Sequence, residues 1–153
     1  MTTTNADKIA KQIKEYGESL QTKMRSLMED VLKAGQRAAD MAYGGRISVT
    51  YEILSGSTAV LSANGAQVCF LEFGTGELVD TGHPYANTIP GVEVYPGSWS
   101  KDHKRTYQRW EASNGAPGTY EYNTEPTFAM YKAYEAMYQA VKEKAREVFG
   151  RGQ

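Results

Sequence analysis

Apolar and polar positions in the first third of the chain repeat with the period of an α-helix. Apolar or small residues recur at steps of three and four, with a mean step of about 3.6. We therefore predict one amphipathic helix over residues 5–43, capped by Asn5 or Asp7 and ended by Gly44-Gly45. Its predicted apolar stripe consists of Ile9, Ile13, Tyr16, Leu20, Met24, Leu27, Val31, Ala34, Ala38 and Met41.

The predicted helix is unusually long for a small protein. Unbroken, it would extend for roughly 55 Å at 1.5 Å per residue, which exceeds the width of a small domain. We therefore expect part of its stripe to pack on a neighbouring subunit. Gly17 and Gly35 leave a second interpretation open, in which the helix breaks into a pair of helices within one monomer.

The pattern changes to alternation after residue 45. Residues 46–54 and 58–63 predict the two strands of a β-hairpin, joined by a turn at Ser55-Gly56-Ser57. Residues 66–73 form an apolar run that is too short for periodicity to separate a strand from a buried helix. We favour a helix there, because Asn64 could cap it and a glycine turn closes it.

Residues 74–125 are the irregular part of the sequence. They contain 7 of the 15 glycines, 4 of the 5 prolines and both tryptophans, so the segment is too long and too varied for an idle loop. Brief alternation predicts short strands at residues 92–95 and 119–122, with Trp99 and Trp110 packing beneath them. Residues 100–112 could hold a helical turn or two.

A final helix is predicted to begin at Pro126, because proline is tolerated in the first turn, with Thr124 as its cap and Gly150 as its end. The whole order predicts a single α+β domain over residues 1–153, with a long inserted loop at 74–125. In this fold a long N-terminal helix precedes a small, mainly antiparallel sheet with a β-hairpin. The C-terminal helix packs on that sheet.

Composition narrows the possible partners. The net charge is −1, with 17 basic and 18 acidic residues, so no global charge favours nucleic acid or an anionic membrane. No apolar segment is long enough to span a membrane, and the N-terminus lacks the apolar core of a signal peptide. The single cysteine, Cys69, allows no intrachain disulfide and is interpreted as a small buried hydrophobe. We expect synthesis in a cytoplasm and no membrane partner.

Candidate chemistry is sparse. His83 and His103 could act as metal ligands or general bases, with Asp80, Asp102 and Glu93 as possible partners. No ligand spacing is specific and no His-x-x-x-His or Cys-x-x-Cys pair is present, so both are interpreted as surface residues of a loop. No phosphate loop or nucleophile elbow is present. A basic run over residues 101–110 contains Tyr107 and Trp110 and has the composition of a nucleic-acid contact. A solvated loop or a contact with an acidic protein surface is the favoured interpretation. We predict no enzyme activity, no cofactor and no metal.

Glu72 lies between large apolar residues and directly before Gly74-Thr75-Gly76. Glutamate is rarely buried without a partner, and burying it unpaired would cost several kcal/mol. No second carboxylate or base stands near it in the sequence, so a structural role is favoured over catalysis. We expect Glu72 to accept hydrogen bonds from the glycine-rich turn or to pair with an arginine across a subunit interface.

Two segments carry a resemblance to a known family. Leu71-Glu72-Phe73-Gly74-Thr75-Gly76 and Glu125-Pro126-Thr127-Phe128-Ala129-Met130 resemble, in sequence and order, signatures of the neck or tail-completion (minor tail component) proteins of long-tailed bacteriophages. Ala133 lies where helices of that family favour a small residue. The resemblance covers roughly residues 5–150, although the segment between the two signatures is long for the family.

The resemblance implies a non-enzymatic virion protein at the junction of head and tail, made in the cytoplasm of the bacterial host. It implies a ring, as a hexamer, that contacts the head connector and the tail-tube or terminator proteins. DNA would pass through the ring without sequence-specific recognition. Six residues would form a structural hinge at the root of the long loop: Glu72, Gly74, Thr75, Gly76, Pro126 and Phe128. Five aromatic residues of that loop would bind partners: Tyr85, Tyr95, Trp99, Tyr107 and Trp110.

Two other functions remain open from the sequence. One is a monomeric binding module that uses the aromatic loop 74–125 as a groove for a sugar or a peptide. The other is a small hydrolase that uses His83 or His103.

Overall fold

The computed structural model describes residues 5–65, 67–86, 88, 94 and 124–150. Several predictions fall outside these residues and stay predictions. They are the strand at 119–122, the strand at 92–95 apart from Val94, the helical turns at 100–112, the basic run at 101–110, and the partner-binding residues Tyr95, Trp99, Tyr107 and Trp110.

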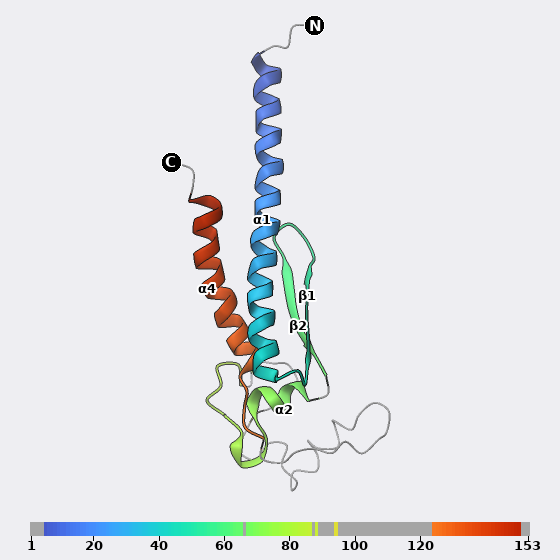
Figure 1. The fold of residues 1–153 in the computed structure, drawn as a ribbon, viewed down its shortest axis with the longest axis vertical. Helices are drawn as coiled ribbons and strands as arrows, with labels where there is room; N and C mark the ends of the chain where they lie inside the picture. The colour runs from blue at the N-terminus through green and yellow to red at the C-terminus, as the bar shows by residue number, and fades with distance from the viewer. Residues whose placement is uncertain (1–4, 66, 87, 89–93, 95–123, 151–153) are drawn as a thin grey trace.

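The first helix, α1 (Asn5–Tyr43), is continuous through Gly17 and Gly35. The predicted long helix is therefore confirmed, and the alternative of a broken helix pair is wrong. Its end lies where the glycines predict it, because Gly44 and Gly45 both adopt positive φ angles, 60° and 76°. In Figure 1 the N-terminal part of α1 extends well beyond every other element of the molecule.

The predicted hairpin is present. Strand β1 (Ser48–Ile53) pairs antiparallel with β2 (Ala59–Asn64), and the two strands form the whole of the described sheet. The turn is closed by Leu54 N–H, which donates to Thr58 O at 2.9 Å. The side chain of Gln36 in α1 donates to Val49 O at 2.7 Å and attaches the hairpin to the helix.

The apolar run after the hairpin forms the short helix α2 (Val68–Phe73), as predicted. Asn64 does not cap it, because that residue is the last of β2, and the residue in the cap position is Gln67. A single 3-10 turn, η1 (Gly76–Leu78), follows.

The prediction for the start of the last helix is wrong. Helix α4 (Ala129–Phe149) begins three residues after Pro126, and its N-cap residue is Phe128 rather than Thr124. Thr124 does not cap the helix because its backbone is hydrogen-bonded to Thr75. Three residues later, Thr127 N–H donates to Leu71 O. These bonds attach residues 124–127 to α2 and the turn after it, and the helix begins only at residue 129.

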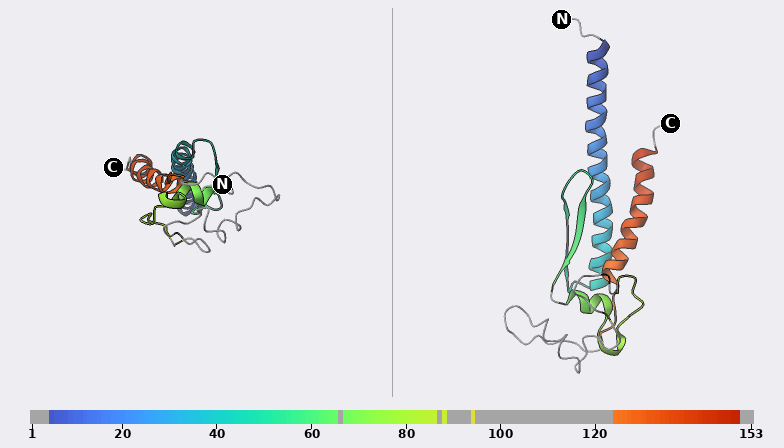
Figure 2. Two further views of the ribbon diagram at one scale, coloured as in Figure 1. Left: turned by 90° about the horizontal axis from the view of Figure 1, so that it is seen from below. Right: turned by 180° about the vertical axis from the view of Figure 1, so that it is seen from behind.

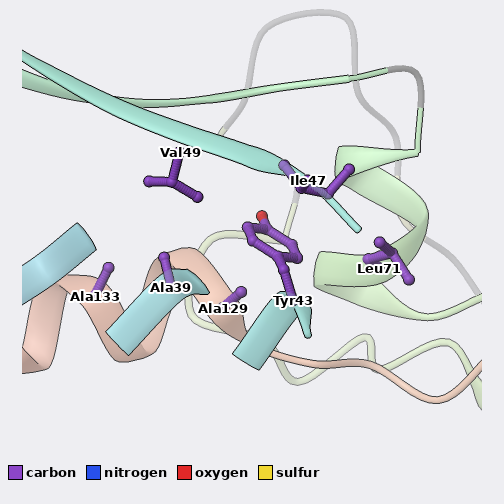
Figure 3. Close-up of a cluster of buried hydrophobic side chains, with 7 residues drawn as sticks. All are labelled: Ala39, Tyr43, Ile47, Val49, Leu71, Ala129 and Ala133. Carbon is purple, nitrogen blue, oxygen red and sulfur yellow. The ribbon is translucent and has the colours of Figure 1, made fainter. Parts of the chain in front are cut away.

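The fold is α+β, as predicted. Helix α1 lies between the hairpin on one side and α4 on the other, and α2 crosses beneath its C-terminal end (Figures 1 and 2). Side chains from all of these layers meet in one apolar core (Figure 3). The core residues are Ala39, Tyr43, Ile47, Val49, Leu71, Ala129 and Ala133. A smaller cluster beside it contains Phe70, Phe73 and Val94.

The predicted stripe of α1 is not the face that α1 buries. In the C-terminal half the buried positions are Leu27, Leu32, Gly35, Ala39 and Tyr43, of which only Leu27 belongs to the predicted stripe. Leu32, Gly35 and Ala39 follow the stripe positions 31, 34 and 38 by one residue, which is about 100° around a helix. Met41, the last residue of the predicted stripe, has 84% of its surface exposed. The stripe therefore runs beside the core.

Candidate functional site: a buried carboxylate at the start of α4

Glu72 is the last but one residue of α2, and only 4% of its surface is exposed. Its carboxylate is surrounded by hydrogen-bond donors from three other parts of the chain. Oε2 accepts from Met130 N–H at 2.9 Å and from Tyr43 Oη–H at 3.3 Å. Oε1 accepts from Tyr131 N–H at 3.1 Å and lies 3.1 Å from Nε2 of His83.

Glu72 therefore caps α4 from another element. With Phe128 in the N-cap position, Met130 and Tyr131 are the second and third helical residues, whose N–H groups have no partner within the helix. A cap side chain normally satisfies them, but Phe128 has no side-chain acceptor. The carboxylate of Glu72 replaces it, and its negative charge is favourable at the positive end of the helix dipole.

His83 is the second member of this cluster, and the prediction that it is a surface histidine is wrong. Its side chain is fully buried beside Glu72. Nδ1 accepts a hydrogen bond from Tyr85 N–H at 3.0 Å, so the ring proton is on Nε2 and points at the Glu72 carboxylate. The ring stacks on Phe128 at 5.2 Å and meets the edge of Phe73 at 4.6 Å.

Tyr43 contributes the third donor from the end of α1. Its ring is fully buried in the apolar core, and its hydroxyl reaches Glu72. Burial, and then the negative charge of Glu72, raise the pKa of Tyr43 well above its usual value. The hydroxyl therefore stays protonated and remains a donor to the carboxylate at every physiological pH.

The glycine turn after α2 fits against the extended chain before α4. Gly74 adopts φ 81°, and a Cβ there would lie 2.6 Å from Leu78 O and 2.9 Å from Thr124 O, so only glycine fits. Thr75 N–H donates to Thr124 O at 3.0 Å, and Thr75 Oγ1 accepts from Thr124 N–H at 2.9 Å. The two ends of the segment from 76 to 123 are thus held together.

Phe128 completes the junction with an uncommon backbone conformation. It is the one non-glycine residue with positive φ (54°) among the residues that the structure describes, a conformation that costs of order 1 kcal/mol or more. Its N–H faces Glu72 O at 3.4 Å, and its ring stacks on His83. These contacts hold the chain in the turn that starts α4.

The cluster also forms part of a small cavity of about 80 Å³. Cys69, Glu72 and His83 all line it, which are residue types found in nucleophilic sites. However, both ring nitrogens of His83 are already engaged. Burial, and then Glu72, raise the pKa of the Cys69 thiol, which opposes formation of the reactive thiolate. In this geometry neither ring nitrogen of His83 is available to accept the proton of the Cys69 thiol.

The buried polar side chains of the described residues are satisfied within the chain. No buried side-chain nitrogen or oxygen there lacks a hydrogen-bond partner, and no group of three or more His, Cys, Asp or Glu residues is arranged to hold a metal ion. Within the same residues, no helix has the length and apolar character to cross a membrane.

The structure brings the predicted hinge residues to one place. Glu72, Gly74 and Thr75 from the first signature meet Pro126 and Phe128 from the second, and Gly76 (φ 65°) starts η1 beside them. The donors to Glu72 are a tyrosine, a histidine and two helix N–H groups, so the prediction that the glycine turn supplies them is wrong. The alternative of an arginine across a subunit interface stays a prediction. The sequence prediction missed Tyr43 and His83, since neither lies in a recognisable motif.

Of the five predicted partner-binding residues, only Tyr85 lies within the described residues. It is half-buried, with its ring 6.0 Å from that of Tyr131 and 6.3 Å from that of Tyr134. The aromatic row continues along the outer face of α4, where the rings of Tyr134 and Tyr138 stack at 6.3 Å. Lys142 lies 4.0 Å above the Tyr138 ring. This row of partly exposed tyrosines was not predicted as a contact surface.

No protein-family model, curated protein or solved structure matches this chain.

Proposed function

We propose that this chain is a structural protein of the bacteriophage virion that acts at the head–tail junction, as a neck or tail-completion protein. In this role it forms a ring, as a hexamer, between the head connector and the tail, and DNA passes through the ring without being read. The chain acts by adhesion and not by catalysis.

The observation that carries the proposal is the meeting of the two family-like segments. Residues 71–76 and 125–130 are far apart in sequence, yet Glu72 bonds to Met130 and Tyr131, and Thr127 bonds to Leu71. Two short motifs that belong to one structural unit support a resemblance more strongly than two unrelated matches. The unit joins α2 to α4 and holds both ends of the loop 74–125.

The shape of the molecule also supports an assembly role. Large apolar side chains are exposed on both long helices, including Ile13 on α1 and Tyr138 on α4. Single exposed apolar residues are ordinary, but rows of them on a helix are typical of surfaces that bind other proteins. The proposed partner-binding residues add Tyr85 at the side of α4, and Tyr95, Trp99, Tyr107 and Trp110 from the segment outside the described residues.

The direct test is genetic. Deleting the gene from the phage or prophage that encodes it should leave DNA-filled heads and separate tails, visible by electron microscopy, and the wild-type gene supplied in trans should restore joined particles. A matched control is Glu52→Ala, an exposed substitution on β1 that should restore joining as well as the wild type. Normal yields of infectious, joined particles without the gene would refute the proposal. Portal, capsid and tail-tube genes are expected to flank it.

A further inference from the structure

The N-terminal half of α1 has an apolar stripe that the molecule itself does not cover. Ile9, Ile13 and Tyr16 have 55%, 67% and 71% of their surfaces exposed, and Leu20 continues the row. In Figures 1 and 2 this part of α1 extends past the hairpin and past the end of α4. The stripe becomes buried farther along the helix at Leu27, but the other buried positions Leu32, Gly35 and Ala39 lie about 100° away around the helix. The exposed residues 9–20 are therefore a face of α1 that the subunit core does not use.

The spacing of the stripe is that of a coiled-coil seam. Ile9, Ile13, Tyr16 and Leu20 follow each other at steps of 4, 3 and 4, which places them at successive d, a, d and a positions of a heptad. A strict a/d stripe of this kind is narrower than the face that a helix uses to pack on a globular core. The pattern therefore indicates packing against other helices.

The charged side chains of this segment lie outside the seam. All six charged residues from 7 to 22 fall at the b, c and f positions, on the side away from the seam: Asp7, Lys8, Lys11, Lys14, Glu15 and Glu18. Several of them already pair along the helix, as Lys11 does with Glu15 at 3.7 Å and Lys14 with Glu18 at 3.9 Å. No ionic group between residues 7 and 22 therefore prevents a second helix from approaching closely.

The two flanks of the seam differ from each other. On one side lie Ala10, Gly17 and Met24, which are small or apolar, and on the other lie Gln12, Ser19 and Ser26, which are small or uncharged polar residues. A two-fold contact uses one and the same patch on both subunits, whereas a closed ring uses two different patches. Two unlike flanks suit a helix that has a different neighbour on each side.

A lone helix of this length also needs a partner. Helical stability in proteins comes mainly from packing of an amphipathic face, and short isolated helices are marginal in water. A second copy of the chain is always present at the same concentration, while any other partner must be met separately. The occupant that these observations favour is therefore the same segment of another copy.

We infer that the N-terminal halves of α1 from neighbouring copies pack in parallel through Ile9, Ile13, Tyr16 and Leu20, and form a collar of helices on the ring. This inference rests on the proposed ring, because cyclic symmetry makes all copies point the same way. The seam is only two heptads long, so the attachment of each helix to a ring supplies the local concentration that the collar needs.

The first test measures self-association of the full chain. The weight-average mass from sedimentation should rise above that of the monomer as concentration increases, and Ile13→Glu should weaken association at least tenfold. The matched control is Gln21→Glu, which adds the same charge at an exposed b position and should leave the mass unchanged. Near-UV circular dichroism checks that each variant keeps its folded core. A wild-type chain that is monomeric at every concentration, or equal effects of the two substitutions, would overturn the collar.

The second test measures orientation. Ala6→Cys in a Cys69→Ala chain places one thiol at the a position before Ile9. In a parallel collar a short bis-maleimide should link these thiols between copies, and adding Ile13→Glu should abolish the link. In an antiparallel pair centred on the seam the thiols lie about 25 Å apart along the axis, so their failure to link in an associated sample would contradict the collar.

The two proposals fail in different ways. If gene deletion blocks head–tail joining but Ile13→Glu restores joined particles as well as Gln21→Glu does, the collar is wrong and the role at the junction stands. If deletion leaves joining intact, the role is wrong, whatever the chain does in solution.

Discussion

The two ends of this molecule differ in where their contacts are made. One, which we call the closed end, is held together by contacts within the chain, and the other exposes apolar side chains. At the end where α2 meets α4, one buried carboxylate is satisfied by four donors and the surrounding side chains are closely packed. At the other end, α1 carries Ile9, Ile13 and Tyr16 into solvent. At the first end, every buried side-chain nitrogen and oxygen of the described residues has a hydrogen-bond partner within the same chain. The second has apolar surface that only another molecule can bury.

The difference separates stability from assembly. Substitutions at the closed end should lower the free energy of unfolding of the subunit, because they remove contacts made within one chain. Substitutions on the exposed stripe should change association and leave the fold intact. Each prediction below tests which end of the molecule a given residue serves.

Glu72→Ala should have the largest effect. It leaves two N–H groups of α4, the Tyr43 hydroxyl and the His83 N–H without their acceptor, so we expect a loss of about 3–4 kcal/mol in the free energy of unfolding. Urea denaturation followed by far-UV circular dichroism measures it. Glu52→Ala, at an exposed position on β1, should change stability by less than about 0.5 kcal/mol. Equal effects at the two positions would show that the carboxylate is not the centre of the closed end.

Tyr43→Phe should change how the free energy of unfolding depends on pH. Tyr43 keeps its proton in the folded state, because its pKa is raised, whereas it ionises near pH 10 in the unfolded chain. Above pH 10 the unfolded state therefore binds fewer protons than the folded state. The contribution of the Tyr43 hydroxyl to stability is present below pH 10 and is lost above it, by about 1.4 kcal/mol per pH unit. Urea denaturation from pH 8 to 11 should show a steeper decline for the wild type than for Tyr43→Phe. Parallel curves would contradict the buried, protonated hydroxyl.

Substituting alanine at two glycines of α1 should have opposite effects on stability. At Gly35 a Cβ would lie 2.6 Å from Cγ of Met137 and 3.2 Å from Cδ2 of Leu61, so Gly35→Ala should destabilise the subunit by about 1 kcal/mol after the gain in helix propensity. At Gly17 a Cβ meets nothing within 4 Å, so Gly17→Ala should strengthen the local helix by about 0.8 kcal/mol. Urea denaturation measures the first effect and amide hydrogen exchange of residues 10–24 the second. A loss of protection in Gly17→Ala would count against an open face there.

The regular elements could be predicted because their signals are local. A 3.6-residue period, an alternation, the Gly44-Gly45 pair and the Ser55-Gly56-Ser57 turn specify α1 and the hairpin to within about two residues. Which face of α1 is buried could not be predicted in the same way. Leu32, Gly35 and Ala39 are as apolar or small as the predicted stripe, and only the positions of α4 and the hairpin decide between the two faces.

The site was only partly predictable. The apolar setting of Glu72 and its glycine turn indicated a buried acid that needs partners, but those partners come from residues 43, 83 and 130–131, and no local pattern identifies them. The start of α4 was misplaced for a related reason. Proline and threonine are good local signals, yet hydrogen bonds to α2 and the turn after it keep residues 124–127 out of the helix. Phe128 also takes a conformation that phenylalanine rarely adopts.

The pairing of Thr75 with Thr124 has a consequence for how such a chain can change. These two residues fix the positions where the intervening segment leaves the body and returns to it, so the length of that segment does not alter the register of α4. The entropy of closing a flexible loop grows only with the logarithm of its length, and doubling the segment would cost about 0.6 kcal/mol. Insertions that keep His83, Tyr85 and Val94 in place should therefore cost little stability, and the subunit could acquire a new binding specificity without a new fold.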